Sequence, residues 1–180
     1  MFVFFKSKPP VNDKSFLINI TDKGVIINGR KKFSLPCDMK RLNKIFGSPR
    51  AAMFETDREN KEFLEAMHGQ NTVTNRVNYS WDALGVYCYT LNGKKATCFG
   101  VRINEKPVAI YPQTPKTSFK GVITVNGAPW LSTVKQGEDC EVFFNYTIGG
   151  FSVIAEFTDD EIDPQERGEQ DFTEIEVQKG

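Results

Sequence analysis

Short runs of β-branched and aromatic residues that end at tight-turn dipeptides constrain the fold of this chain more than any other feature. The pairs Asn92-Gly93, Asn126-Gly127 and Gly149-Gly150 each follow such a run. Asn-Gly favours the turn of a two-residue β-hairpin. Val, Ile, Phe, Tyr and Trp are also more than twice as numerous as Ala, Leu and Met, which is typical of half-buried strands. The sequence therefore predicts a protein dominated by antiparallel sheet.

One segment has the features of an amphipathic helix. Asp38 is a suitable N-cap, and Leu42, Ile45 and Phe46 share one helical face. Residues 60–67 have a similar but shorter pattern. We therefore expect an α+β fold, a single domain rich in antiparallel β-sheet with one or two helices packed on one face.

The length of the chain and its apolar runs limit the class of protein. With 180 residues, the chain can bury a substantial core as one domain. Its longest apolar run, residues 1–5, is far shorter than the roughly 20 residues of a membrane helix, and Lys6 and Lys8 interrupt any secretory signal. We expect a cytoplasmic protein without membrane contact, with a globular domain over 1–157 and an acidic segment over 158–180.

The acidic segment makes the chain electrically polar. Basic and acidic residues number 23 each, but residues 158–180 carry a net charge of −7 and leave +7 for residues 1–157. We interpret the segment as an edge strand or a partly disordered tail. It either adds solubility alone or meets a basic surface on a partner. In the second case the partner-binding residues are Asp159, Asp160, Glu161, Asp163, Glu166, Glu169, Asp171, Phe172, Glu174, Ile175 and Glu176.

A basic region lies between residues 30 and 50, where one acidic residue, Asp38, accompanies seven basic ones. Two interpretations are open. The region either docks the acidic tail within the molecule or is only a solvated helix face, or else it binds nucleic acid or another anionic ligand, which we favour less. The basic residues are Arg30, Lys31, Lys32, Lys40, Arg41, Lys44 and Arg50.

Residues suited to catalysis are few. His68 is the only histidine, and its place at the end of a predicted helix is the ordinary position of a cationic side chain. No C-x-x-C or H-x-x-x-H spacing indicates a metal site, and no glycine-rich phosphate loop is recognised. We therefore expect no metal, no cofactor and no enzymatic activity.

We expect the four cysteines to be reduced thiols. They are Cys37, Cys88, Cys98 and Cys140. If Asn92-Gly93 forms a two-residue loop, Cys88 lies opposite Thr97 and Cys98 lies opposite Tyr87. The two thiols then lie on opposite faces of the sheet.

Two stretches resemble each other. In each stretch a glycine is followed by a short run of β-branched residues and then by Asn-Gly, over residues 24–29 and 121–127. A duplicated half-domain explains this similarity, and so does the frequent chance occurrence of such hairpins.

The segment Y-S-W-D-A-L-G-V-Y, residues 79–87, is the most distinctive in the chain. It reads as a structural corner between two strands. Alternatively, Tyr79 and Trp81 form an aromatic ligand platform with Arg50 or Arg76.

Three motifs in this order resemble a family of uncharacterised bacterial domains. They are Ile26-Ile27-Asn28-Gly29, the helix end Ile45-Phe46-Gly47-Ser48-Pro49-Arg50 and the strand entry Tyr79–Val86. In that family an I-N-G strand, an I-L-G-x-P-x-R helix end and a Y-x-W-D-x-L-G-I strand entry recur, and Phe46 replaces the usual leucine. The order of helix and aromatic strand is also similar to modules of β-lactamase-inhibitor-like proteins, which are antiparallel sheets with helices on one face.

The resemblance implies an immunity protein that binds a cognate antibacterial toxin or effector protein and neutralises it by occlusion. The segregated charge is suited to steering a charged partner. We expect such a protein to act as a monomer or weak homodimer. The alternative function is a nucleic-acid or anionic-ligand binding module that uses the basic 30–50 region, and an enzyme ranks last.

Overall fold

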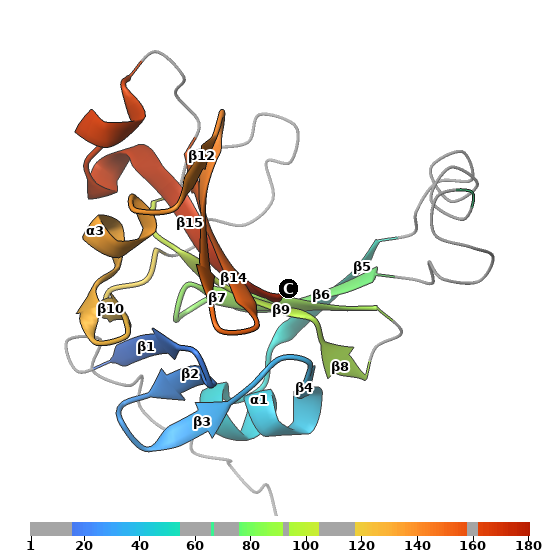
Figure 1. Cartoon of the computed structure of the whole chain (residues 1–180). Coiled ribbons are helices and arrows are strands. Elements are labelled where there is room, and N and C mark those ends of the chain that lie inside the picture. Colours follow the sequence, from blue (N-terminus) through green and yellow to red (C-terminus); the bar gives the residue numbers. More distant parts are fainter. Residues whose placement is uncertain (1–15, 55–65, 67–75, 92–93, 105–117, 158–161) are drawn as a thin grey trace, which may run out of the picture.

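The structure is a computed structural model that describes residues 16–54, 66, 76–91, 94–104, 118–157 and 162–180. Within these residues, two β-sheets and two α-helices share one core (Figure 1). The elements are β1 (Leu17–Thr21), β2 (Gly24–Ile27), β3 (Lys31–Phe33), β4 (Cys37–Asp38), α1 (Met39–Phe46), β5 (Arg50–Phe54), β6 (Arg76–Trp81), β7 (Val86–Leu91), β8 (Lys95–Ala96), β9 (Cys98–Arg102), β10 (Val122–Val125), β11 (Ala128–Pro129), α3 (Trp130–Val134), β12 (Glu138–Cys140), β13 (Phe143–Ile148), β14 (Phe151–Phe157), the 3₁₀ turns η2 (Pro164–Glu166) and η3 (Glu169–Asp171), and β15 (Phe172–Lys179).

The five-stranded small sheet has the order β11-β10-β1-β2-β3, and the ten-stranded large sheet runs β12-β13-β14-β15-β9-β7-β6-β5, with β8 paired to β7 and β4 paired to β8. The sheet-rich α+β fold and the helix α1 were predicted from the sequence, whereas helix α3 was not. The pairing is antiparallel throughout the large sheet, whereas β1 and β10 pair in parallel, which the sequence did not predict.

The turns of the small sheet follow from their residues. Asn28 and Asn126 have φ values of 51° and 50°, and the glycines that follow, Gly29 and Gly127, have 65° and 79°. Two successive left-handed residues are what a type I′ turn requires, and Asn-Gly tolerates them at low cost. These turns reverse β2 into β3 and β10 into β11.

Helix α1 forms where the sequence predicts it. Its N-cap, Asp38, accepts a hydrogen bond from the backbone N–H of Lys40 at 2.8 Å, and Gly47 ends the helix with φ 91°. The ring of Phe46 lies 5.3 Å from that of Trp81 and 5.6 Å from that of Phe99, between centroids. The helix therefore packs on the large sheet through the predicted apolar face.

The element order is repeated in two halves. The first half runs β2, β3, α1 and then the strands β5, β6, β7 and β9, and the second runs β10, β11, α3 and then β12, β13, β14 and β15. The two four-stranded units join through the antiparallel pairing of β9 with β15. In the small sheet, β1 lies between β2 and β10. This arrangement supports the interpretation of residues 24–29 and 121–127 as parts of a duplicated half-domain.

The expectation of an edge strand or partly disordered tail is wrong for residues 172–179. They form β15, an inner strand hydrogen-bonded to β14 on one side and to β9 on the other. Phe172, Ile175 and Val177 are at most 2% exposed and belong to the core. Acidic residues alternate with these apolar ones along the strand. The negative net charge of the segment therefore did not reveal that its apolar side chains belong to the core.

The cysteines lie as predicted, although the hairpin register differs from the predicted one. Thr90 pairs with Ala96, and Tyr87 pairs with Gly100, because the chain forms the short strand β8 against β7 before it enters β9. Cys88 contacts Met39 in the core at 3.6 Å between sulfurs, while Cys98 lies opposite Gln178 on the other face. None of the four cysteines forms a disulfide.

We predict that the protein needs β15 in order to fold. Deletion of residues 158–180 removes the strand that joins both halves of the large sheet, and the truncated chain should lose its cooperative unfolding transition and its native circular dichroism. The milder change Ile175→Ala should lower the free energy of unfolding by about 2–5 kcal/mol, measured by urea denaturation. A truncated chain that unfolds cooperatively would contradict this role.

Candidate functional site

One face of the large sheet packs on the helices and the small sheet, and the other, which we call the open face, carries polar and aromatic side chains. Successive side chains of a strand point to opposite faces. The strand registers therefore place one row of directly paired residues on the open face. This row is Arg50, Ser80, Tyr87, Gly100, Glu176, Ile154 and Asn145.

A second row of the open face brings together Arg102, Glu174, Glu156 and Phe143, which are paired across β9, β15, β14 and β13. Glu156 is exposed, and the other three are half-buried. Glu156 is therefore the residue of this row that is most accessible to a partner.

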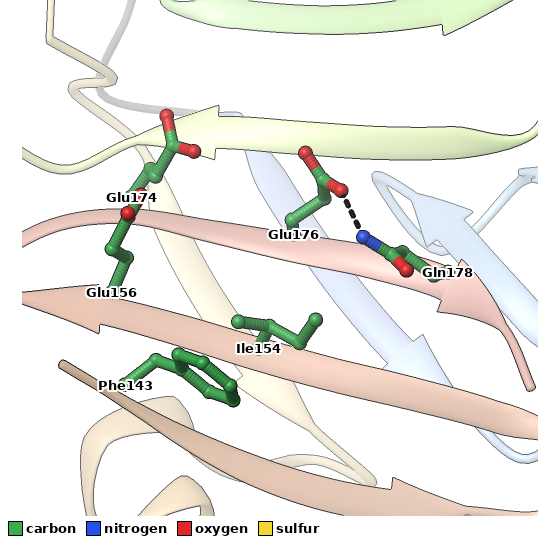
Figure 2. Close-up of a pocket in the computed structure, with 6 residues that line it drawn as sticks. All are labelled: Phe143, Ile154, Glu156, Glu174, Glu176 and Gln178. Atoms are coloured by element: carbon green, nitrogen blue, oxygen red, sulfur yellow. Dashed lines mark hydrogen bonds between the residues drawn. The ribbon is translucent and has the colours of Figure 1, made fainter. Parts of the chain in front are cut away.

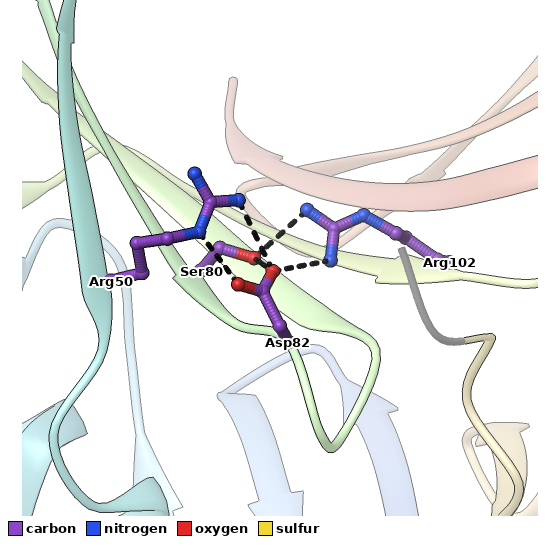
Figure 3. Close-up of polar contacts among 4 residues, drawn as sticks. All are labelled: Arg50, Ser80, Asp82 and Arg102. Atoms are coloured by element: carbon purple, nitrogen blue, oxygen red, sulfur yellow. Dashed lines mark hydrogen bonds and ion pairs between the residues drawn. The ribbon is translucent and has the colours of Figure 1, made fainter. Parts of the chain in front are cut away.

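At one end of the open face, two arginines surround one carboxylate (Figure 3). Arg50 donates from Nε to Oδ2 of Asp82 at 2.7 Å and from Nη2 to Oδ1 at 3.3 Å. Arg102 donates from Nη2 to the hydroxyl of Ser80 at 3.0 Å, and its Nη1 lies 3.8 Å from Asp82 Oδ1. The hydrogen bond from Arg50 lowers the pKa of Asp82 below its ordinary value. This cluster has a net charge of +1.

The centre of the open face is a tyrosine ring that lies flat on the backbone. A Cβ atom added to Gly100 would lie 2.0 Å from Cζ of Tyr87, so only glycine lets the ring take this place. The hydroxyl of Tyr87 donates to Oε2 of Glu176 at 3.1 Å, and the guanidinium carbon of Arg102 lies 5.2 Å from the ring centroid. Burial raises the pKa of Tyr87, which keeps the phenol in its donating form.

Beside Tyr87 the open face is hollowed into a pocket of about 240 Å³ (Figure 2). Its walls combine three carboxylates with an amide and two apolar side chains. Oε1 of Glu176 accepts a hydrogen bond from the Gln178 amide at 2.5 Å, while Glu174 and Glu156 stand directly opposite each other on neighbouring strands. Like charges in that position repel. The lining residues are Phe143, Ile154, Glu156, Glu174, Glu176 and Gln178.

The residues predicted to bind a partner do not form one site. Glu174 and Glu176 lie on the open face, but Phe172 and Ile175 are fully buried and cannot be anchors for a partner, which corrects that prediction. The other seven positions lie outside this face or outside the described residues. Asp163 caps η2, Asp171 accepts from the N–H of Gly168, Glu166 and Glu169 are exposed near η2 and η3, and Asp159, Asp160 and Glu161 are not described.

The segment 79–87 is a corner, as the first interpretation had it. The N–H of Leu84 bonds the carbonyl of Trp81 at 2.9 Å, and Gly85 has φ 68°. Trp81 is 4% exposed and donates from its indole to the carbonyl of Gly47. The alternative of a Tyr79–Trp81 platform is therefore wrong, because both rings lie on the core face of β6.

Sequence reasoning missed Tyr87, Arg102 and Glu156 as site residues. Alternation within 86–91 and 98–102 places Tyr87 and Arg102 opposite the apolar side of their strands, but only the register brings them together. His68 and the helix expected over 60–67 lie outside the described residues, apart from residue 66.

The basic region divides between two surfaces. Arg50 belongs to the open face through its pair with Asp82, whereas Arg30, Lys31, Lys32 and the cations of α1 are exposed on the far side of the core. The acidic residues of β15 point away from α1, so the expected docking of this part of the tail on the basic region does not occur.

In the described part of the chain, no group of three or more His, Cys, Asp or Glu side chains is arranged to hold a metal ion. No helix in these ranges has the length and apolar character that a membrane span requires.

The fold and the open face define a two-sheet protein with an exposed polar surface. Residues 17–139 match the family DUF7738, a domain of unknown function. Because the match spans more than half of the chain, the protein belongs to this family. No curated protein and no solved structure gives a significant match.

We predict that Gly100→Ala displaces Tyr87 and lowers the free energy of unfolding by about 1–3 kcal/mol, since the new methyl group overlaps the ring. Tyr87→Ala should relieve most of this loss, so the double-mutant cycle should show strong coupling. Gly150→Ala is the control, because no atom lies within 4 Å of the added Cβ. An additive cycle would contradict the contact.

Burial raises the pKa of Glu174, and the nearby Glu156 raises it further, while Tyr87 and Arg102 act in the opposite direction. The native state therefore holds this proton to higher pH than the unfolded chain, and its stability falls as pH rises above the ordinary carboxyl range. Glu174→Gln should stabilise the protein more at about pH 8 than at about pH 4. Urea denaturation at both values tests this, with the exposed Glu169→Gln as control. An equal effect at both would contradict it.

Proposed function

We propose that the protein is an immunity protein that binds a cognate toxin or effector protein through the open face and neutralises it by occlusion. The observation that carries the proposal is the pre-ordered surface formed by Arg50, Arg102, Tyr87 and Glu176. On this proposal the protein acts in the cytoplasm as a monomer or weak homodimer, and has no catalytic role of its own.

The arrangement of Tyr87 and Arg102 supports a binding role. Tyrosine and arginine are enriched among the residues that dominate interface energies. Here Arg102 is held by Ser80 and Tyr87, and Tyr87 is held by Gly100 and Glu176. Side chains already fixed in place lose little entropy when a partner binds.

The size and charge of the open face support the same role. Eight strands spaced about 4.8 Å apart give it a width of about 34 Å, which suits an interface of standard size. A cationic side chain of the partner in the pocket would relieve the repulsion between Glu156 and Glu174. The apolar walls, Phe143 and Ile154, would contact its alkyl stem.

We predict that charge reversal in the pocket abolishes protection. The reading frame adjacent to the gene is co-expressed with each variant, and growth and the Kd of the purified pair are measured. Glu156→Lys should lose growth rescue and weaken binding at least about tenfold, because it places a cation where the partner's cation binds. Glu156 is exposed, so the change leaves the core intact.

The matched control is Glu166→Lys, an exposed reversal outside the open face. It should protect as well as the wild type. Protection that fails in Glu166→Lys and persists in Glu156→Lys would move the interface to the segment around η2. A wild-type chain that neither rescues growth nor binds the neighbouring product would overturn the proposal.

A further inference from the structure

We propose that a second surface, separate from the open face, binds the phosphate backbone of duplex nucleic acid. We call it the basic surface. It consists of Arg30, Lys31, Lys32, Lys40, Arg41, Lys44, Lys94 and Lys95, all of which are exposed. The proposal is independent of the immunity function, because the open face lies on the other side of the large sheet.

Three segments distant in sequence form the basic surface. The guanidinium of Arg41 on α1 donates to the carbonyl of Lys32 on β3, which ties helix to strand. The N–H of Met39 bonds the carbonyl of Lys94 at 3.2 Å, and Asp38 pairs with Lys95 across β4 and β8. The fold therefore adds two lysines to the cations that the sequence groups over 30–44.

Little negative charge balances these cations within the basic surface. Asp38 is the only acidic residue in the segments 30–33, 37–46 and 94–96, and its carboxylate caps the N–H of Lys40. Among the described residues, no ion pair involves the eight cations. Crowded like charges repel one another, and the negative charges of a bound polyanion offset that repulsion. The polyanion also releases its own counterions, which favours binding.

The second half of the molecule shows that the fold does not require these charges. Residues 121–134 repeat the order of strand, Asn-Gly, strand and helix, and contain no Asp, Glu, Lys or Arg. Helix α3 packs on the same core through Trp130 and Val134. The cations of the first half are therefore an addition to the shared architecture.

The chemistry of the basic surface favours duplex nucleic acid. Proteins that bind single strands combine cations with exposed aromatic rings, but Phe33 and Phe46 of these segments pack on the core. Binding to a membrane surface uses apolar side chains as well as cations, and the exposed large apolar residues among those described are Val122 and Val142, outside the basic surface. Lysines without aromatic partners suit sequence-independent phosphate contacts.

The test is the binding of the full chain to a fluorescently labelled 20-base-pair DNA duplex and to an RNA duplex, by anisotropy, over a range of salt concentrations. The triple variant Lys32→Gln, Lys40→Gln, Lys44→Gln should weaken binding at least about tenfold at low salt. It should also reduce the slope of log K against log salt by about three, since each lost phosphate contact removes about 0.9.

The control removes the same charge elsewhere, as Lys23→Gln, Lys120→Gln, Lys179→Gln, all exposed positions outside the basic surface. It should bind nearly as the wild type does, and circular dichroism should show all variants folded. Equal weakening by the two triple variants would overturn the proposal, because binding would then depend on the net charge of the protein and not on the basic surface. So would no duplex binding at low salt, or tighter binding to phosphatidylserine vesicles or polyglutamate.

Discussion

The antiparallel pairing of β9 with β15 is the interaction on which the rest of the molecule depends. It joins two half-domains of the same element order into one large sheet, more than 70 residues apart in sequence at Val101 and Ile175. On the core side this seam buries both of these residues. On the other side it places Arg102 beside Glu174 and Gly100 beside Glu176. The same strand pairing therefore forms both the polar surface and this part of the core.

Features that depend on local chemistry were predictable from the sequence. The Asn-Gly turns at 28–29 and 126–127, the cap at Asp38 and the apolar face of α1 each involve residues close in the chain, and each forms as expected. The turn at Gly149-Gly150 also forms, between Ile148 of β13 and Phe151 of β14. In these cases the residues favour one backbone conformation, and the neighbouring sequence is enough to identify that conformation.

Features that depend on register were not predictable. The acidic residues of 172–179 suggested an exposed tail. The alternation of Glu with Ile and Val indicates a half-buried strand, but it does not show which strands lie on either side of it. The place of Tyr87 on Gly100 likewise depends on the short strand β8, which shifts the pairing of β7 with β9. The parallel pairing of β1 with β10 has no local signal at all. Each of these is a contact between distant segments.

The position of β15 has a consequence for how the protein is made. As the last strand of the large sheet in chain order, β15 inserts between β14 and β9, which are already synthesised. During translation the backbone groups along the facing edges of β9 and β14 therefore have no partner until β15 pairs with them. Such edges are prone to wrong pairing. A nascent chain of this protein therefore exposes two unpaired strand edges until β15 is available to pair with both β14 and β9.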